Sequence, residues 1–317
     1  MPADGLGSCA EPLEVAYDAA LLDLDGVLYV GPDAVPYAAP AVSRARRAGM
    51  RLAFVTNNAS RRPEVVAAHL TSLGIAAEPD DVVTSAQAAV RYLAERLEPG
   101  SPVLVIGTEG LAEEVEAGGL RPVRKADGVA AVVQGLSTTT SWADLAEAAV
   151  AIRSGALWVA GNRDVTYPSP RGPVPGNGAL VAALEAATGL SPVVVGKPQP
   201  ELHQASVERV GARNPLVVGD RLDTDVLGAR GTGTDSLLVL TGVTSEDELL
   251  GAPPHLRPTY VGWDLRALAA PQPVVEVDGE GARCGQARAW RRGDELVAEG
   301  PADLALRARC ALAWAAG

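Results

Sequence analysis

The sequence has 317 residues, enough for two domains, and 47% of them are hydrophobic, which is ordinary for a globular protein. The 39 acidic and 27 basic residues give a net charge of −12, which argues against nucleic acid and anionic membrane surfaces as partners, because both are bound by an excess of Lys and Arg. Cys9, Cys284 and Cys310 lie far apart without a CxxC pair, so the sequence indicates neither a disulfide framework nor a zinc site.

The beginning of the sequence shows no sign of a targeting segment. Residues 1–18 contain acidic side chains and lack a basic stretch followed by an apolar one, so they do not resemble a signal peptide. A membrane-spanning helix needs about 18 consecutive apolar residues without charge, and the sequence has no such run. We therefore expect a cytoplasmic protein without a membrane partner.

Short apolar runs alternate with Ala-rich segments along the chain. Runs of Val, Leu and Ile without alternation are typical of strands buried on both faces, as in a parallel sheet covered by helices. In the segments between them apolar residues recur every three or four positions, and several segments end in Gly, as helices do. The pattern predicts an α/β fold with strands at ALLDL (20–24), RLAFVT (51–56), VLVIG (103–107), AAVVQG (130–135), LWVAG (157–161), PVVVG (192–196), LVVGD (216–220) and LLVLTG (237–242), and helices over 39–49, 62–74, 86–97, 141–155 and 177–189.

Four of the predicted strands end in chemically reactive or polar side chains. In an open parallel sheet, ligands bind outside the carboxyl ends of the strands, so these side chains are the candidates for a functional site. They are Asp23 with Asp25, Thr56 with Asn57 and Asn58, Lys197, and Asp220 with Asp223 and Asp225.

Carboxylates brought together at one sheet edge indicate a bound cation. Asp23, Asp25 and Asp220 at one edge would repel one another, and they could not all stay ionised without a compensating positive charge. Mg²⁺ prefers oxygen ligands in octahedral geometry, and no His or Cys lies near these motifs. Lys197 adds a fixed positive charge, while Thr56 and the N–H groups after it can donate hydrogen bonds to an anion.

This combination predicts a site for phosphoryl transfer, where catalysis consists mainly of positioning and charge neutralisation. A carboxylate can act as the nucleophile and form an aspartyl-phosphate that is hydrolysed in a second step. We expect Asp23 to attack phosphorus, and Asp25 to donate a proton to the leaving oxygen and later to accept one from water. Gly26 lets the chain turn directly after the two aspartates.

Each motif taken singly has a simpler interpretation. A lone DxD is usually a turn or a helix cap, TNN a polar turn, and GKP the entry to a helix. GDRLDTD could be a solvated acidic loop or a weak Ca²⁺ loop, although it lacks the Gly and Glu spacing of an EF-hand. The occurrence of all four motifs in this order, each after an apolar run, favours the catalytic interpretation.

The motifs resemble those of the haloacid dehalogenase (HAD) superfamily. DLDGVLY (23–29), FVTNNAS (54–60), VVGKP (194–198) and VVGDRLDTD (217–225) are similar to its first to fourth motifs. LYVG, RPEVVAAHLTSLGI and GNRDVTYPSPRGPVPGNGALVAALEAATG resemble subfamily IIA, which includes 4-nitrophenyl phosphatases, phosphoglycolate and glycerol-3-phosphate phosphatases, and pyridoxal phosphate and nucleotide phosphatases. The resemblance covers roughly residues 16–265.

The resemblance implies a Rossmann-like core that is interrupted by a large α/β cap domain. It places the core at residues 1–84 and 196–265 and the cap at 85–195. It also implies roles for the motif residues. Asp23 would be nucleophile and Mg²⁺ ligand, Asp25 acid/base with its carbonyl on the metal, Asp220 the third ligand, Thr56 and Lys197 the holders of the phosphoryl group, and Asp225 a group that orders metal-bound water or Lys197. Asp223 receives no role.

Substrate selection is expected in the cap, which in the family closes over the core. Asn162, Arg163 and Asp164, with Asn57 and Asn58 of the core, are the candidate substrate-binding residues. In GLSTTTSWADL (135–145), where relatives carry an Asp and some a His, this chain has Leu136, Ser137 and Thr139. Small hydroxyl groups suit a polyol phosphate such as glycerol 3-phosphate, or they cap the helix that begins at Trp142.

Residues 266–317 continue beyond the region of resemblance. Their pattern predicts two or three strands, with turns at DGEG and RRGDE, followed by a helix: a small α+β extension. The extension could serve dimerisation, docking to the cap, or only structure.

Taken together, the sequence predicts a Mg²⁺-dependent phosphomonoesterase for a small phosphorylated metabolite. Glycerol 3-phosphate is the preferred substrate, with compounds such as phosphoglycolate or 4-nitrophenyl phosphate as alternatives. Two other functions stay open: a phosphotransferase that uses an alcohol in place of water, and a metabolite sensor with the extension as its interaction domain. A homodimer could form through the cap or the extension.

Overall fold

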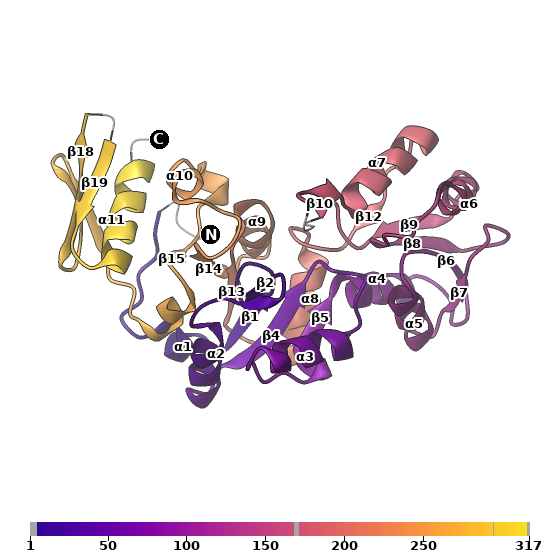
Figure 1. The fold of residues 1–317 in the computed structure, drawn as a ribbon, viewed down its shortest axis with the longest axis horizontal. Helices are drawn as coiled ribbons and strands as arrows, with labels where there is room; N and C mark the ends of the chain where they lie inside the picture. Colours follow the sequence, from indigo (N-terminus) through magenta and orange to yellow (C-terminus); the bar gives the residue numbers. More distant parts are fainter. Residues whose placement is uncertain (1–4, 168–170, 294, 316–317) are drawn as a thin grey trace. The chain divides into compact units, whose positions relative to one another are not determined.

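The computed structural model of the protein describes residues 5–167, 171–293 and 295–315. The chain forms two compact units, whose secondary structure Figure 1 shows. The first unit comprises Met1–Val55, His69–Ala77 and Ser206–Gly317, and the second comprises Thr56–Ala68 and Glu78–Ala205. Two of the boundaries fall within helices, namely α3 (Pro63–Ser72) and α8 (Pro200–Val210).

A parallel sheet forms the centre of the first unit. Strand β1 (Ala19–Asp23) pairs with β13 (Pro215–Gly219) on one side and with β4 (Arg51–Thr56) on the other, and β14 (Asp235–Val239) and β15 (Tyr260–Gly262) extend the sheet beyond β13. Leu22 lies between Val218 and Phe54 in this register, and all three side chains are fully buried. Because the strands are parallel, their carboxyl ends share one edge, and Asp23 and Asp220 lie at this edge.

Helices and short segments complete the first unit around this sheet. They are α1 (Leu13–Ala16), the hairpin of β2 (Tyr29–Val30) and β3 (Asp33–Ala34), α2 (Ala38–Arg47), the π-helical turn η2 (Leu222–Val226), α9 (Leu227–Gly231), α10 (Glu246–Leu250), and the 3-10 segments η3 (Pro254–Leu256) and η4 (Leu265–Ala269). The α/β class predicted from the apolar runs is confirmed.

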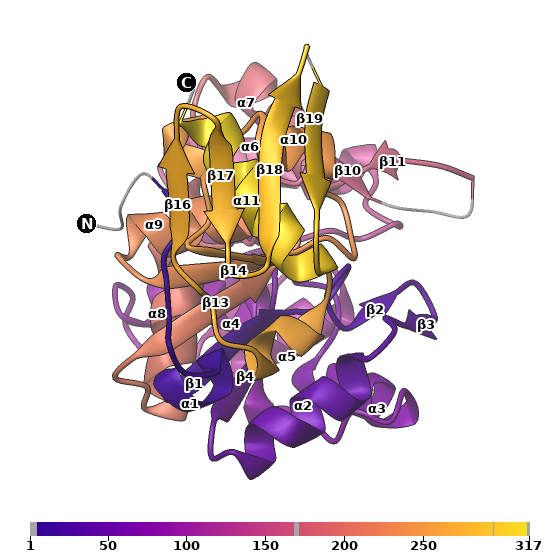
Figure 2. The same ribbon diagram turned by 90° about the vertical axis from the view of Figure 1, so that its left-hand side faces the viewer.

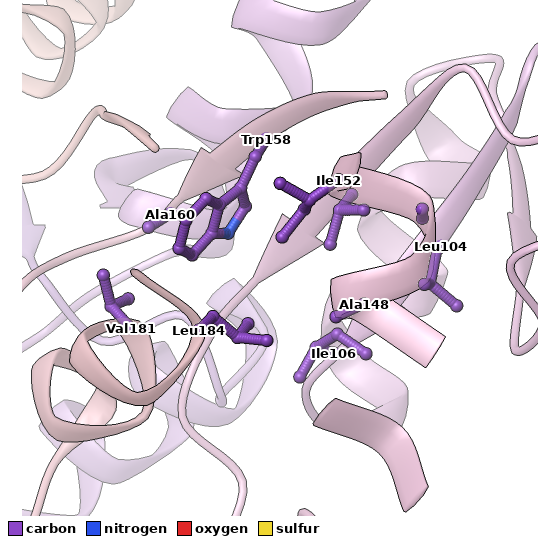
Figure 3. Packing of buried hydrophobic residues seen from close by; sticks show 10 residues of the cluster. Leu104, Ile106, Ala148, Ile152, Trp158, Ala160, Val181 and Leu184 are labelled. Atoms are coloured by element: carbon purple, nitrogen blue, oxygen red, sulfur yellow. The ribbon is translucent and has the colours of Figure 1, made fainter. Parts of the chain in front are cut away.

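The second unit has a parallel sheet of its own, with the strand order β12 (Val193–Val194), β9 (Leu157–Ala160), β8 (Ala131–Gln134), β6 (Pro102–Ile106) and β7 (Arg121–Val123). Its core is an apolar cluster in which Trp158, Ile152 and Leu184 pack together (Figure 3). Capping boxes define two of its helix starts, since Thr84 caps α4 and Ser141 caps α6. The other elements are η1 (Pro79–Asp81), β5 (Val82–Thr84), α4 (Ser85–Ala94), α5 (Glu109–Ala117), α6 (Trp142–Arg153), β10 (Thr166–Tyr167), β11 (Val174–Pro175) and α7 (Asn177–Thr188).

The C-terminal extension belongs to the first unit and forms an antiparallel sheet with one helix (Figure 2). The sheet contains β16 (Val275–Asp278), β17 (Gly281–Cys284), β18 (Ala287–Arg292) and β19 (Glu295–Glu299), and α11 (Ala302–Trp314) follows. The expectation of two or three strands is corrected to four. Strand β17 was missed because its sequence, GARC, turns only the small side chains of Ala282 and Cys284 inward.

Buried Arg307 joins the extension to the rest of the first unit. Its guanidinium donates hydrogen bonds to Gln272 Oε1 and to the carbonyls of Gly7 and Pro273, at 2.7 to 2.8 Å. Burial lowers the pKa of this group from its usual value. Among the helices that the structure describes, none combines the length and the apolar character needed to cross a membrane.

Candidate active site

The turn after β1 gives its two aspartates different surroundings. Asp23 is the last residue of the strand and is partly buried, whereas Asp25 is exposed. Gly26 has a φ of +85°, in the left-handed region that favours glycine, and its N–H donates to the Tyr29 carbonyl over 2.8 Å. The chain therefore reverses directly after Asp25, as its sequence predicts.

Three carboxylates converge at this edge of the first unit. Asp220 follows β13 and is completely buried, and Asp225, in the turn η2, is 1% exposed. Asp23, Asp220 and Asp225 each offer one oxygen, and these oxygens all lie within 4.8 Å of one another. Carboxylates at such distances, two of them removed from water, require a cation or protons for stability.

The donor set of this cluster fits a hard divalent cation. All three side-chain ligands are carboxylate oxygens, and neither His nor Cys belongs to the cluster among the described residues. Oxygen-only donors suit Mg²⁺ or Ca²⁺ and do not suit the metals that prefer nitrogen or sulfur. Asp225, to which the family resemblance gives only the ordering of metal-bound water or of Lys197, offers an oxygen within the same 4.8 Å limit as the other two. The exposed Asp25 carboxylate is not part of this cluster, although Asp25 lies two residues after Asp23 in the same turn.

Asp223 is not part of this carboxylate cluster. Its carboxylate is mostly exposed and accepts two hydrogen bonds from Arg221, at 3.0 and 2.8 Å. These hydrogen bonds lower the pKa of Asp223. The geometry agrees with the absence of a role for this residue in the sequence prediction.

In the second unit, Thr56 and Asn58 form a compact turn after β4. Thr56 is 4% exposed, and its Oγ1 accepts a hydrogen bond from the Asn58 N–H at 3.1 Å. Asn58 Oδ1 accepts from the N–H and the hydroxyl of Ser60, at 2.7 and 2.6 Å. Asn58 therefore orders the turn through its side chain, as Asn does in Asx turns.

Asn57 connects this turn to the segment of Lys197. Asn57 Nδ2 donates to the Lys197 carbonyl over 3.1 Å, and the Lys197 N–H donates to Asn57 Oδ1 over 2.7 Å. The Asn57 carbonyl accepts two more bonds, from Ser85 Oγ at 2.6 Å and from Asn162 Nδ2 at 2.7 Å. Lys197 is 5% exposed. Sequence reasoning missed Ser85, because the three-residue strand β5 that precedes it has no recognisable pattern in the sequence.

The other predicted substrate-binding residues differ in burial and in their bonding partners. Asn162 is buried and touches Asn57, and its Oδ1 accepts from the Asp164 N–H at 3.1 Å. Arg163 instead forms an ion pair with Glu185 of α7 at 2.6 Å. Thr139 is exposed and bonds to Ser137, with 2.9 Å between the hydroxyl oxygens. Helix α6 does begin at Trp142, but Ser141 caps it, and neither Ser137 nor Thr139 does.

Comparisons with known proteins identify the family of this chain. Residues 20–121 match the family model of haloacid dehalogenase-like hydrolases, and residues 194–268 match a second HAD-hydrolase-like model. The D-glycerol 3-phosphate phosphatase of Mycobacterium tuberculosis is 54% identical over 84% of this chain and 77% of its own length. The chain belongs to the haloacid dehalogenase-like hydrolase family.

Further relatives within this HAD family are also phosphatases. The acid sugar phosphatase of Staphylococcus saprophyticus is 36% identical over 78% of this chain and 95% of its own length. A crystal structure of the M. tuberculosis glycerol phosphate phosphatase with magnesium aligns with a TM-score of 0.83 and 48% identity, covering 98% of this chain and 93% of that one. The p-nitrophenyl phosphatase of Archaeoglobus fulgidus aligns with a TM-score of 0.75 and 30% identity, covering 80% of this chain and 98% of that one. The chain is therefore a HAD phosphatase, and the predicted family and enzyme class are confirmed.

Proposed function

We propose that this HAD phosphatase is a Mg²⁺-dependent phosphomonoesterase whose substrate is glycerol 3-phosphate. The observation that carries the proposal is the cluster of Asp23, Asp220 and Asp225, whose oxygens lie within 4.8 Å of one another. The relative that is 54% identical is a D-glycerol 3-phosphate phosphatase, which supports the substrate, and the similar crystal structure of the M. tuberculosis glycerol phosphate phosphatase contains magnesium, which supports the metal.

The reaction follows from the chemistry of the named groups. Asp23 Oδ attacks phosphorus, the ester P–O bond breaks, and the carboxyl proton of Asp25 passes to the leaving glycerol oxygen. Water then attacks the aspartyl-phosphate while Asp25 accepts its proton, which releases phosphate and restores the Asp23 carboxylate. Asp23, Asp220 and the Asp25 carbonyl would hold Mg²⁺, with Asp225 as a supporting carboxylate, and the metal would supply positive charge to neutralise the phosphoryl oxygens.

The phosphoryl group is held, in this proposal, by Thr56 and Lys197. Thr56 follows Val55 on β4, and Val55 pairs with Asp23 in the sheet. Lys197 is held by Asn57 of the same turn. We propose Asn162, Arg163, Asp164 and Thr139 as residues of a cap at 85–195 that selects the substrate, with Asn57 and Asn58 acting on its phosphate through their turn.

A substrate panel tests the proposed function directly. Phosphate release would be measured with glycerol 3-phosphate, phosphoglycolate, 4-nitrophenyl phosphate and glucose 6-phosphate, each with Mg²⁺ and with a chelator. We expect the highest kcat/KM for glycerol 3-phosphate and no turnover with the chelator. A higher kcat/KM for the sugar phosphate would contradict the substrate assignment. Added ethanol, with analysis for ethyl phosphate, distinguishes hydrolysis from phosphotransfer.

We further propose a cytoplasmic homodimer that forms through the cap. Trp142 and Val150 lie two helical turns apart on α6, and their side chains are 83% and 58% exposed. Light scattering after size-exclusion chromatography would test this, since Trp142→Ala should yield monomers if the wild type is a dimer. A monomeric wild type would refute the dimer.

A further inference from the structure

The carboxylate of Asp220 lies in a slot between two glycines. A Cβ atom at Gly26 would lie 2.4 Å from Asp220 Oδ2, and one at Gly242 would lie 2.0 Å from the same oxygen. The Val243 N–H donates to Oδ2 over 2.6 Å, and the Thr244 N–H donates to the Asp220 carbonyl over 3.1 Å. The segment Thr241–Thr244 therefore fixes both the side chain and the backbone of Asp220.

The two walls of this slot are also tied to each other. Thr241 Oγ1 donates to the Gly26 carbonyl over 2.5 Å, which joins the segment after β14 to the turn after β1. A shift of Thr241–Thr244 would therefore disturb Asp220 and the turn of Asp25 together.

The slot segment continues directly into helix α10. Ser245 caps this helix, because its hydroxyl accepts from the Glu248 N–H at 3.3 Å while the Glu248 carboxylate accepts from the Ser245 N–H at 2.8 Å. No flexible linker separates Thr244 from the helix. The position of α10 therefore sets the position of the slot.

Helix α11 of the C-terminal extension holds α10 by two polar contacts. Trp314 Nε1 donates to the Leu249 carbonyl over 3.0 Å. Arg309 forms an ion pair with Glu246, in which both side chains are about three-quarters buried, at 25% and 26% exposure. A partly buried ion pair of this kind is screened less by solvent than one at the surface.

The apolar face of α11 packs against the elements that carry the Asp220 slot and Asp225. Leu306, Cys310 and Trp314 are spaced four residues apart and so lie on one face of the helix. They share a buried cluster with Leu249 of α10, with Leu238 of β14, and with Val226, the residue after Asp225. The elements that carry Asp220's slot and Asp225 thus rest on the same helix.

We propose that the C-terminal extension, residues 266–317, is a positioning module for the carboxylate cluster, in which α11 holds α10 and α10 holds Thr241–Thr244 against Asp220. The inference deepens the proposed function, since it rests on Asp220 being a metal ligand. It assigns to the extension a task in Mg²⁺ binding, which a purely structural annex would not have.

The first experiment changes the slot itself. Gly242→Ala places a methyl group against Asp220, and Gly231→Ala is the matched control, because no atom lies within 4 Å of a Cβ at that position. Mg²⁺ binding is measured by titration calorimetry and, separately, by the Mg²⁺ concentration for half-maximal activity. We expect both constants to rise about 10- to 100-fold in Gly242→Ala, as for changes to groups that orient metal ligands, and to stay unchanged in Gly231→Ala.

The second experiment changes α11 at a distance from the cluster. Arg309→Ala and Trp314→Phe each remove one contact with α10, Arg309→Lys keeps the charge, and Arg288→Ala on the exposed face of β18 is the control. Assays are made well below each variant's Tm. We expect the Mg²⁺ dissociation constant to rise about 3- to 30-fold in Arg309→Ala and Trp314→Phe, the range of typical coupling energies, with partial rescue in Arg309→Lys.

The outcomes separate this inference from the proposed function. A lowered Tm with unchanged Mg²⁺ binding in Arg309→Ala and Trp314→Phe would overturn the positioning role and leave a structural one. Wild-type protein that neither binds Mg²⁺ nor releases phosphate would overturn the proposed function, and the inference with it. Weaker Mg²⁺ binding in the α11 variants, with the control unchanged, supports the inference.

Discussion

The side-chain amide of Asn57 forms two hydrogen bonds with the backbone of Lys197. One hydrogen bond runs from Nδ2 to the Lys197 carbonyl and the other from the Lys197 N–H to Oδ1, at 3.1 and 2.7 Å, between residues 140 positions apart in the sequence. Gly196 permits this approach, because a Cβ there would lie 2.7 Å from Asn57 Oδ1 and 2.2 Å from the Gly161 carbonyl oxygen. Asn57 therefore acts on Lys197, and we expect it to influence the substrate through that lysine.

Replacement of Asn57 should weaken substrate binding, and the loss should be larger in Asn57→Ala than in Asn57→Asp. Asn57→Ala removes both hydrogen bonds, whereas Asn57→Asp keeps the acceptor for the Lys197 N–H and removes the donor. The loss of a partner for a buried polar group costs about 1–3 kcal/mol, so we expect kcat/KM to fall about 5- to 150-fold in Asn57→Ala and less in Asn57→Asp. Steady-state kinetics measure the effect. Equal losses in the two variants would contradict the assignment of two separate bonds.

Asp23→Asn should abolish turnover without unfolding the protein. The amide cannot act as the nucleophile, and the loss of a positioned catalytic group lowers kcat by at least ~10². Asp223→Asn is the matched control, an Asp of the fourth motif that lies outside the carboxylate cluster, because Asp223 is exposed and bonds to Arg221. Phosphate release and circular dichroism would be compared for the two variants. Normal turnover in Asp23→Asn, or an equal loss in Asp223→Asn, would refute the nucleophile assignment.

Calcium should inhibit the enzyme in competition with magnesium. Ca²⁺ binds the same oxygen ligands but takes six to eight of them at longer distances, which disturbs the in-line approach of Asp23 to phosphorus. Rates would be measured at fixed Mg²⁺ with rising Ca²⁺, and excess Mg²⁺ should restore them. Undiminished rates with Ca²⁺ as the sole divalent ion would contradict the proposed role of the metal.

The sequence predicts those parts of the fold that burial alone determines. The runs ALLDL, RLAFVT and LVVGD form most of β1, β4 and β13, because the central residues of strands covered on both faces are buried and therefore apolar. The short strands β7 and β5 were not predicted. RPV and VVT are three residues long and carry no pattern of their own, so only their neighbours in the structure define them.

The sequence predicts the charged groups of the candidate site, but it does not predict the residues and backbone groups that hold them in place. Asp23 and Asp220 stand out after apolar runs, but the role of Asn57 depends on a contact with a backbone 140 residues away. The slot around Asp220 depends on Gly242 and on the Val243 N–H, and backbone groups have no signature in the sequence. The ion pair of Arg163 with Glu185 of α7 likewise joins residues 22 positions apart, and no local pattern in the sequence marks it.

The core of the second unit contains a buried polar pair whose loss should be measurable as stability. Trp158 is 4% exposed, and its Nε1 donates to Oε1 of the fully buried Gln134 over 3.1 Å. Trp158→Phe leaves this oxygen without its donor and leaves a small cavity, so we expect the free energy of unfolding to fall by about 2–4 kcal/mol. Val65→Ala is the control, because Val65 is 53% exposed in the same unit and its replacement should change the free energy of unfolding by less than ~0.5 kcal/mol. Urea denaturation followed by circular dichroism measures both variants. Equal stability of Trp158→Phe and the wild type would show that the hydrogen bond to Gln134 contributes nothing to the fold.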